Sequence, residues 1–325
     1  MAESTEMRAV PAHGVGVLVE IVRTMRPKDW LKNAFVFAAI AFSQQHLWTR
    51  PIPLLVTFGA FICFCLAAGS IYLINDLVDI EKDRAHPRKR NRPLPSGRLK
   101  PGMAWVAAII CMTVAIGSGF WLDVAYVPSP GPVGWAGHNL DFGAILITYV
   151  LVQGVLYSYY LKNIVILDIF TIAAGFVLRA VAGATVLDIN ITPWLLICMG
   201  LLALFLGIAK RRAEIVLLQD GAGDHRRILQ EYSLPLLDQM MSIVIAATLI
   251  AYTLFTTTAP TLPHEPFSLM LVTVPFVAYA IFRYLYLIYK HGGGGNPADL
   301  VLHDIPLAVA IGSWGLISLG ILLFA

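Results

Sequence analysis

Residues 53–74 read PLLVTFGAFICFCLAAGSIYLI, and the nine residues that follow, 75–83, read NDLVDIEKD. The first stretch carries no charge, and about 20 predominantly apolar residues are enough for a helix to cross a bilayer. The second stretch places Asp76, Asp79 and Asp83 directly after that apolar run. The sequence therefore predicts a membrane-spanning helix with three carboxylates at one end.

The whole chain has the composition of an integral membrane protein. Of its 325 residues, 58% are hydrophobic and only 13% are charged, with a mean hydropathy of +0.74, whereas soluble domains carry about 25% charged residues. The apolar runs do not alternate as the strands of a lipid-facing β-barrel would. We expect an all-α polytopic bundle, one domain over residues 1–325, with nine transmembrane helices at 33–48, 53–74, 103–122, 143–161, 164–186, 193–209, 239–258, 267–289 and 306–324.

Positive charge is distributed unevenly between the connections. Twenty of the 23 Lys and Arg fall in one alternating set of connections, and the opposite set holds only Arg50. The positive-inside rule therefore places the N-terminal segment 1–32 in the cytoplasm. Within it, Val15–Met25 fits either an interfacial amphipathic helix or a loosely ordered tail. The net charge of +3 thus reflects membrane orientation and a phosphate site, and indicates no nucleic-acid partner.

The three carboxylates are predicted to share one face of the helix. Successive helical residues turn by about 100°, so Asn75, Asp76, Asp79 and Asp83 fall within an arc of about 100°. Glu81 points elsewhere and is predicted to be a bystander. Grouped carboxylates repel one another unless a cation neutralises them, and hard oxygen ligands favour Mg²⁺.

Basic residues follow the acids directly: His86, Arg88, Lys89, Arg90 and Arg92. One interpretation is a solvated helix end whose acids pair with these bases. The other is a substrate site, because acids that hold a metal beside bases that hold phosphate oxygens suit a Mg²⁺–diphosphate substrate. The shared face of the acids favours the substrate site.

Four further polar groups are predicted at the same membrane face, each with an ordinary alternative. Lys28 and Lys32 fit interfacial anchors, and Tyr157 with Lys162 fits an aromatic belt with a snorkelling lysine. Charges inside a span usually face a bundle interior or a water-filled cavity. The remaining candidates are Asp168 and Arg179 in the fifth span and Lys210, Arg211 and Glu214 at the end of the sixth. Arg179 also fits a structural arginine that pairs with a neighbouring helix. Lys210 and Glu214 also fit a simple i, i+4 ion pair. Together they predict a cavity that is polar at its mouth and apolar below.

These motifs resemble the UbiA superfamily of membrane prenyltransferases over most of the chain. The residues from Asn75 to Asp83, with His86, Lys89 and RPLPSG at 92–97, are similar to the family's first Asp-rich motif, which binds Mg²⁺ and a diphosphate. Where typical members carry a second Asp-rich motif, this chain reads GIAKRRAE at 207–214. That departure, with RPKDWLKN and YSYYLKN, resembles the decaprenyl-phosphate phosphoribosyltransferase branch.

The resemblance implies a reaction and its partners. The donor would be 5-phosphoribosyl diphosphate (PRPP), the acceptor a polyprenyl (decaprenyl) phosphate, and the product a precursor of cell-wall arabinan. The protein would lie in the inner (plasma) membrane, among membrane lipids, with its site facing the cytoplasm. The oligomeric state stays open, a homo-oligomer included. The alternatives are prenyl transfer to an aromatic acceptor, and a non-enzymatic lipid-binding protein or transporter.

The predicted site follows from these considerations. Asp76, Asp79 and Asp83 would hold Mg²⁺ on the diphosphate. As the family's Tyr–Lys pair implies, Tyr157 and Lys162 would assist the departing diphosphate or the ribose. The predicted substrate contacts are Lys28, Lys32, Asn75, Arg88, Lys89, Arg90, Arg92, Asp168, Arg179, Lys210, Arg211 and Glu214.

Overall fold

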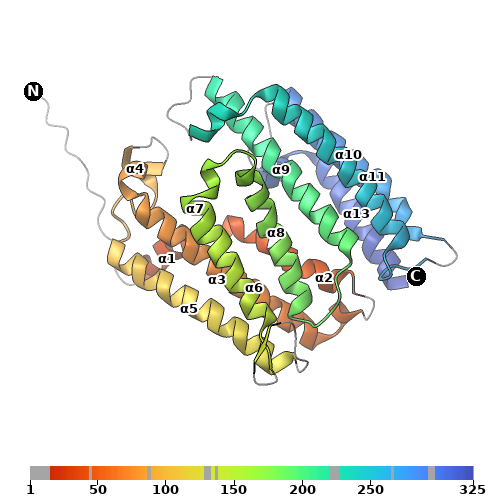
Figure 1. The fold of residues 1–325 in the computed structure, drawn as a ribbon, viewed down its shortest axis with the longest axis horizontal. Coiled ribbons are helices and arrows are strands. Elements are labelled where there is room, and N and C mark those ends of the chain that lie inside the picture. The colour runs from red at the N-terminus through yellow and green to blue at the C-terminus, as the bar shows by residue number, and fades with distance from the viewer. Residues whose placement is uncertain are drawn as a thin grey trace, which may run out of the picture. The chain divides into compact units, whose positions relative to one another are not determined.

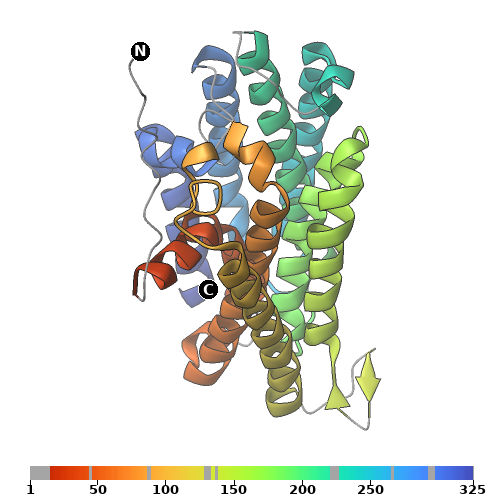
Figure 2. The same cartoon turned by 90° about the vertical axis from the view of Figure 1, so that its left-hand side faces the viewer.

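The computed structural model describes residues 15–43, 46–85, 89–127, 133–135, 138–219, 227–264, 267–291 and 297–324. These residues are almost entirely helical, which confirms the all-α prediction. Two short strands, β1 (Gly134–Trp135) and β2 (His138–Asn139), pair between α5 (Pro101–Tyr126) and α6 (Asp141–Tyr149) (Figure 2).

Among the described residues, eight helices are long and apolar enough to cross a membrane: Pro51–Val78, Pro101–Tyr126, Asp141–Tyr159, Leu167–Thr185, Pro193–Val216, Leu234–Thr258, Leu269–Lys290 and Ile305–Phe324. They match eight predicted spans. The remaining prediction, 33–48, falls on the 3-10 helix η1 (Pro27–Phe37), the four-residue α2 (Ala38–Ala41) and η2 (Leu47–Thr49). The nine-span count is therefore not confirmed, and the side of the N-terminus stays a prediction.

The chain packs as two units. The first comprises Met1–Ala38, Pro51–Ser158 and Ala182–Asp188, and the second comprises Ala39–Arg50, Tyr159–Val181 and Ile189–Ala325. The first unit contains α1 (Val15–Thr24), η1, α3 (Pro51–Val78), α4 (Ile80–Ala85), η3 (Lys89–Asn91), α5, α6, the π-helical η4 (Val150–Leu156) and the start of α7 (Tyr157–Tyr159).

Small side chains allow α3 and α5 to pack closely in the first unit, as in many membrane helix pairs. The buried small residues are Ala60, Ala67, Ala68 and Gly69 of α3 and Ala104, Ala107, Ala108 and Ala115 of α5. A Cβ at Gly69 would lie 2.5 Å from Cε of Met25, so the end of α1 also packs tightly here. Residues 15–24 are thus a packed helix rather than a loose tail, and Leu18, Val19 and Val22 on it are exposed.

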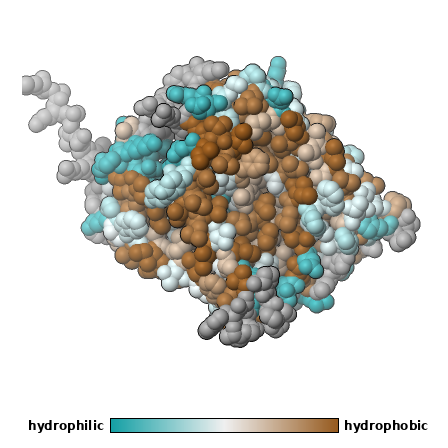
Figure 3. All heavy atoms as spheres, in the orientation of Figure 1, coloured by the Kyte–Doolittle hydropathy of each residue, from teal (hydrophilic) through white to brown (hydrophobic). Residues whose placement is uncertain are grey.

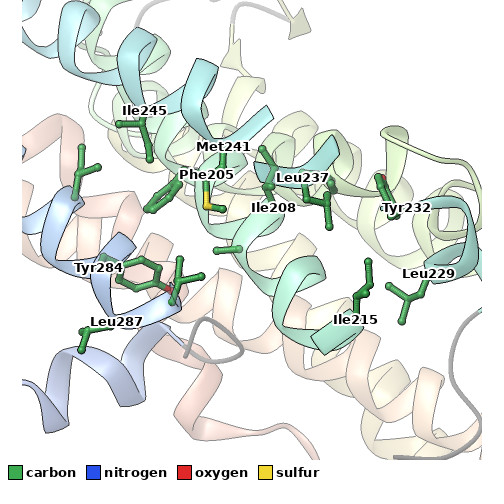
Figure 4. Packing of buried hydrophobic residues seen from close by; sticks show 14 of the residues in the cluster. Phe205, Ile208, Ile215, Leu229, Tyr232, Leu237, Met241, Ile245, Tyr284 and Leu287 are labelled. Carbon is green, nitrogen blue, oxygen red and sulfur yellow. The ribbon is translucent and has the colours of Figure 1, made fainter. Parts of the chain in front are cut away.

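The second unit contains most of the helices that follow residue 159. It contains η5 (Leu161–Asn163), most of α8 (Leu167–Thr185), α9 (Pro193–Gln219), η6 (Arg227–Glu231), α10 (Leu234–Thr258), η7 (Leu269–Thr273), α11 (Val274–His291), α12 (Pro297–His303) and α13 (Ile305–Phe324). Helices α9 and α10 lie side by side, as do α11 and α13 (Figure 1). Phe205 and Ile208 of α9, Leu237 and Met241 of α10 and Tyr284 of α11 share one apolar core (Figure 4).

The outer surfaces of the long helices are apolar. Ile52, Leu55 and Phe58 of α3 and Ile243 and Ile250 of α10 are all exposed. Figure 3 shows such side chains over much of the visible surface. Soluble monomers rarely expose large contiguous apolar patches. The chain is an integral membrane protein.

Candidate functional site

Two of the predicted acids are buried at the end of the first long helix. Asp76 of α3 is 3% exposed and Asp83 of α4 is 2% exposed. Helical bonds continue between them, because the N–H of Asp79 donates to the carbonyl of Asn75 (3.0 Å) and the N–H of Asp83 donates to the carbonyl of Asp79 (2.8 Å). The predicted register therefore holds across the boundary between α3 and α4.

One guanidinium joins these two carboxylates. Nη1 of Arg92 donates to Oδ1 of Asp76 at 3.1 Å and to Oδ2 of Asp83 at 2.7 Å, so the two oxygens lie less than about 6 Å apart. Nζ of Lys89 lies 3.5 Å from Oδ1 of Asp83. The acids and the following bases thus form one compact cluster.

Arg26 completes the cluster, and the sequence prediction missed it. Its Nη2 donates to Oδ1 of Asp76 at 2.7 Å, and its guanidinium lies 4.6 Å from the ring centroid of Tyr72. Its backbone has φ 56° directly before Pro27, a conformation that bulky residues avoid and that costs about 1–3 kcal/mol. Strain of this kind is often kept at functional sites.

The other predicted residues around the acids differ in accessibility. Asp79 and Asn75 are half-buried. The side chain of Glu81 is 84% exposed and pairs with Arg84 at 2.7 Å, away from the cluster, as its angular position predicts. Asn75 and Asp79 therefore remain candidates, and Glu81 does not join the two buried acids.

The outlying basic residues of the first unit are more open. Lys28 and Arg90 are exposed, and Lys32 pairs with Asp29 at 2.6 Å. Arg88 lies outside the described residues, as does His86. Substrate contacts from these positions stay predictions.

The carboxylates of Asp76 and Asp83 are the type of ligand that binds divalent metal ions. In the described part of the chain, no three His, Cys, Asp or Glu side chains are grouped closely enough to hold one. However, Asp76 and Asp83 already share one cationic nitrogen, and Mg²⁺ in proteins is commonly held by one or two carboxylates together with substrate phosphates. A metal ion between them would require the guanidinium of Arg92 to move.

A second polar network lies in the second unit. Arg211 of α9 is fully buried; its Nε donates to Oδ2 of Asp168 on α8 at 2.6 Å and its Nη1 to Oε2 of Glu214 at 2.7 Å. The hydroxyl of Tyr232 donates to Oδ1 of Asp168 at 2.6 Å and accepts from the N–H of Ile166, also at 2.6 Å. Four side chains from three parts of the chain therefore form one hydrogen-bonded series.

Tyr232 was not among the predicted residues. Burial, and then its hydrogen bond to Asp168, raise the pKa of its phenol above the ordinary value of 10. Because a raised tyrosine pKa favours the neutral form, the hydroxyl keeps its proton at neutral pH and acts as the donor. As the pH rises through that raised pKa, the phenol loses its proton and can no longer donate to Asp168.

The remaining predicted residues have separate environments. Arg179 is buried, and its Nη1 donates to the carbonyl of Gly175 at 2.6 Å. Lys210 is exposed and Lys162 is half-buried, both in the second unit. Tyr157, in the first unit, is half-buried and directly follows the π-helical η4. The joint action of Tyr157 and Lys162 stays a prediction.

The buried pair makes Arg211 important for stability. We expect Arg211→Met to lower the free energy of unfolding by about 3–5 kcal/mol, because Asp168 would keep a buried charge without its cation. Thermal unfolding in detergent measures this loss. Arg212→Met should cost less, about 1 kcal/mol, because its partner Asp238 is partly solvated. Equal losses in the two variants would contradict the assignment.

Comparison with known proteins identifies the family of the chain. Residues 33–298 match the model of the UbiA prenyltransferase family. The chain belongs to that family, and the resemblance predicted from its motifs is confirmed. Membership supports a transferase embedded in a membrane.

Individual proteins are also similar to this chain. The chain is 30% identical over 322 residues to a decaprenyl-phosphate phosphoribosyltransferase of Mycolicibacterium smegmatis, covering 97% of this chain and 95% of that protein. It is also 30% identical to the protein of the same name from Corynebacterium glutamicum, covering 90% and 84%. A solved UbiA homolog from Archaeoglobus fulgidus, bound to GPP and Mg²⁺, superposes with a TM-score of 0.65 at 16% identity, over 93% of this chain and 99% of that one. The last similarity shows the fold.

Proposed function

We propose that this chain transfers 5-phosphoribose from PRPP to a polyprenyl phosphate, decaprenyl phosphate being the expected acceptor, and releases diphosphate. The observation that carries the proposal is the buried pair Asp76–Asp83, which shares Arg92 and is flanked by Arg26 and Lys89. Such a cluster suits a metal-bound diphosphate. The names of relatives that align over nearly the whole chain support PRPP as the donor.

Mg²⁺ is proposed to be held by Asp76 and Asp83, with Asp79. Bound there, Mg²⁺ would neutralise the negative charge of the diphosphate and so favour its departure. The side chains of Arg26, Arg92 and Lys89 supply further positive charge to phosphate oxygens. The other candidate contacts are Lys28, Lys32, Asn75, Arg88, Arg90, Arg179, Lys210 and Glu214, with Asp168 and Arg211 buried behind Glu214. Tyr157 and Lys162 would contact the departing diphosphate or the ribose.

The chemistry requires little proton transfer. The bond between C1 of ribose and the diphosphate oxygen breaks, and an oxygen of the lipid phosphate forms a new bond to C1. Because that oxygen is already anionic at pH 7, no general base is needed. The side chains therefore act mainly by positioning the reactants and by neutralising the leaving group.

The proposed setting follows from the substrates. PRPP is a soluble, highly charged donor, so a site that faces the cytoplasm of the plasma membrane would meet it directly. The segment 1–32 would lie on the same side, where the excess of Lys and Arg predicts the cytoplasm. The product would be a lipid-linked precursor of cell-wall arabinan.

One assay separates the candidate functions. Membranes that contain the protein would be supplied with labelled PRPP and polyprenyl phosphate, and separately with labelled prenyl diphosphate and an aromatic acid. We expect labelled lipid only from the first pair. A lipid product from the second pair alone would indicate prenyl transfer, and no product from either would favour a non-enzymatic lipid-binding protein or transporter.

A further inference from the structure

The hydrogen-bonded series in the second unit has one accessible end. Asp168 and Arg211 are buried completely, and Tyr232 is buried as well. The side chain of Glu214 is 28% exposed. Its Oε2 bonds Arg211, and within the described residues its Oε1 has no protein partner. A molecule that approaches the end of α9 can therefore reach Glu214 but not Arg211.

Arg211 is unsuited to contact phosphate directly. Its Nε and Nη1 are bound to Asp168 and Glu214 at 2.6 and 2.7 Å. To reach an anion, Arg211 would have to give up charge-assisted bonds and leave Asp168 charged in a buried place. Arg211 thus affects a substrate through the carboxylate of Glu214, which it fixes in position.

Tyr232 extends the same series to a strained turn. Ile166 has φ 71°, in the left-handed region that β-branched residues rarely enter. The hydroxyl of Tyr232 accepts a hydrogen bond from the N–H of Ile166 and donates one to Asp168, which lies two residues after Ile166. One hydroxyl therefore fixes both the turn before α8 and the carboxylate that binds Arg211. Strained residues held in this way often position functional groups.

We propose that Tyr232 and Arg211 are positioning residues and that Glu214 is the group of this network that contacts the donor. Its carboxylate would accept hydrogen bonds from the vicinal hydroxyls of the ribose. An ionised carboxylate only accepts hydrogen bonds, so it suits a diol and repels a phosphate. This inference rests on the proposed function, because a prenyl diphosphate has no hydroxyl group for Glu214 to bind.

Donor analogues test the proposal. The purified chain in lipid nanodiscs would be assayed with PRPP and with its 2-deoxy and 3-deoxy analogues, and kcat and KM would be measured for each. We expect Glu214→Gln to raise KM for PRPP about 10- to 100-fold. For at least one of the two deoxy analogues, which lacks a hydroxyl that Glu214 would bind, the same substitution should change kcat/KM by less than about threefold. The preference of the wild type for PRPP would then collapse. The quantity compared between variants is the ratio of kcat/KM for PRPP to kcat/KM for each analogue, so differences in the intrinsic reactivity of the analogues cancel.

Two further variants separate positioning from general stability. Tyr232→Phe removes the shared hydroxyl and should reduce the same preference, though less than Glu214→Gln. Tyr284→Phe is its control, since the hydroxyl of Tyr284 is buried without a hydrogen-bond partner among the described residues. It should leave the preference unchanged. Glu214→Asp keeps the charge but shortens the side chain, and we expect it to lose part of the preference while remaining folded.

The outcomes are distinct. If wild-type protein gives no labelled lipid from PRPP, both the proposed function and this inference fail. If wild-type protein is active but Glu214→Gln keeps the full preference for PRPP over both analogues, only the inference is overturned. If Tyr232→Phe and Tyr284→Phe reduce the preference equally, Tyr232 has no positioning role.

Discussion

Replacing Asp83 by asparagine is expected to lower kcat/KM for PRPP by at least about 100-fold, or about 2.7 kcal/mol of transition-state stabilisation. Asp83 is almost completely buried and its carboxylate contacts both Arg92 and Lys89. Asparagine keeps the shape of the side chain but removes the charge. It would therefore weaken metal binding and leave the two cations without their shared partner. Initial rates at several PRPP and Mg²⁺ concentrations measure the effect.

The control lies two residues earlier on the same short helix. Glu81 points to solvent and pairs only with Arg84 among the described residues. Glu81→Gln removes one carboxylate charge from α4 without touching the buried cluster, and its activity should stay within about threefold of wild type. If Asp83→Asn retains full Mg²⁺-dependent turnover, Asp83 is not part of the metal site.

Arg92→Met is expected to have the second largest effect, a fall of about 10- to 100-fold in kcat/KM. Arg92 is bonded to both Asp76 and Asp83, and a bond to a charged group contributes about 1.5–3 kcal/mol. Without it, Arg26 and Lys89 are the cations that still pair with the two buried carboxylates among the described residues. We also expect the midpoint of thermal unfolding to fall, which differential scanning in detergent would show.

Two other variants serve as controls for Arg92→Met. Arg92→Lys should recover only part of the activity, because an ammonium group does not reproduce the planar fork of arginine. Arg84→Met, which changes an exposed guanidinium on α4, should stay within about threefold of wild type. If Arg92→Met binds and uses PRPP as well as wild type does, the bridge between the carboxylates has no role in donor binding.

Much of the fold was predictable because its determinants are local. The length and hydropathy of each apolar run decide whether it can span a membrane, and within the described parts of the chain eight of the nine runs form such helices. The run 33–48 is not among these helices, because its described residues form a 3-10 helix followed by short helical pieces, and His46 has a left-handed φ of 47°. Neither feature has a signal in hydropathy.

The candidate site was predictable only in part, for the same reason. Helical periodicity relates residues a few positions apart, so the common orientation of Asp76 and Asp83 could be inferred. The contact of Arg26 with Asp76 spans 50 residues and that of Tyr232 with Asp168 spans 64. No local pattern encodes such contacts. Arg211 was recognised as a charged residue of interest, but its complete burial could be learned only from the packing of α8 and α9.

The fate of each phosphate tests the central claim most directly. Purified protein in nanodiscs would receive polyprenyl phosphate and PRPP labelled either at the 5-phosphate or in the diphosphate. We predict that the 5-phosphate label enters the lipid and that the diphosphate label is released in equal amount to the aqueous phase. Diphosphate label in the lipid, or no transfer from PRPP while prenyl diphosphate gives a lipid product, would contradict the account.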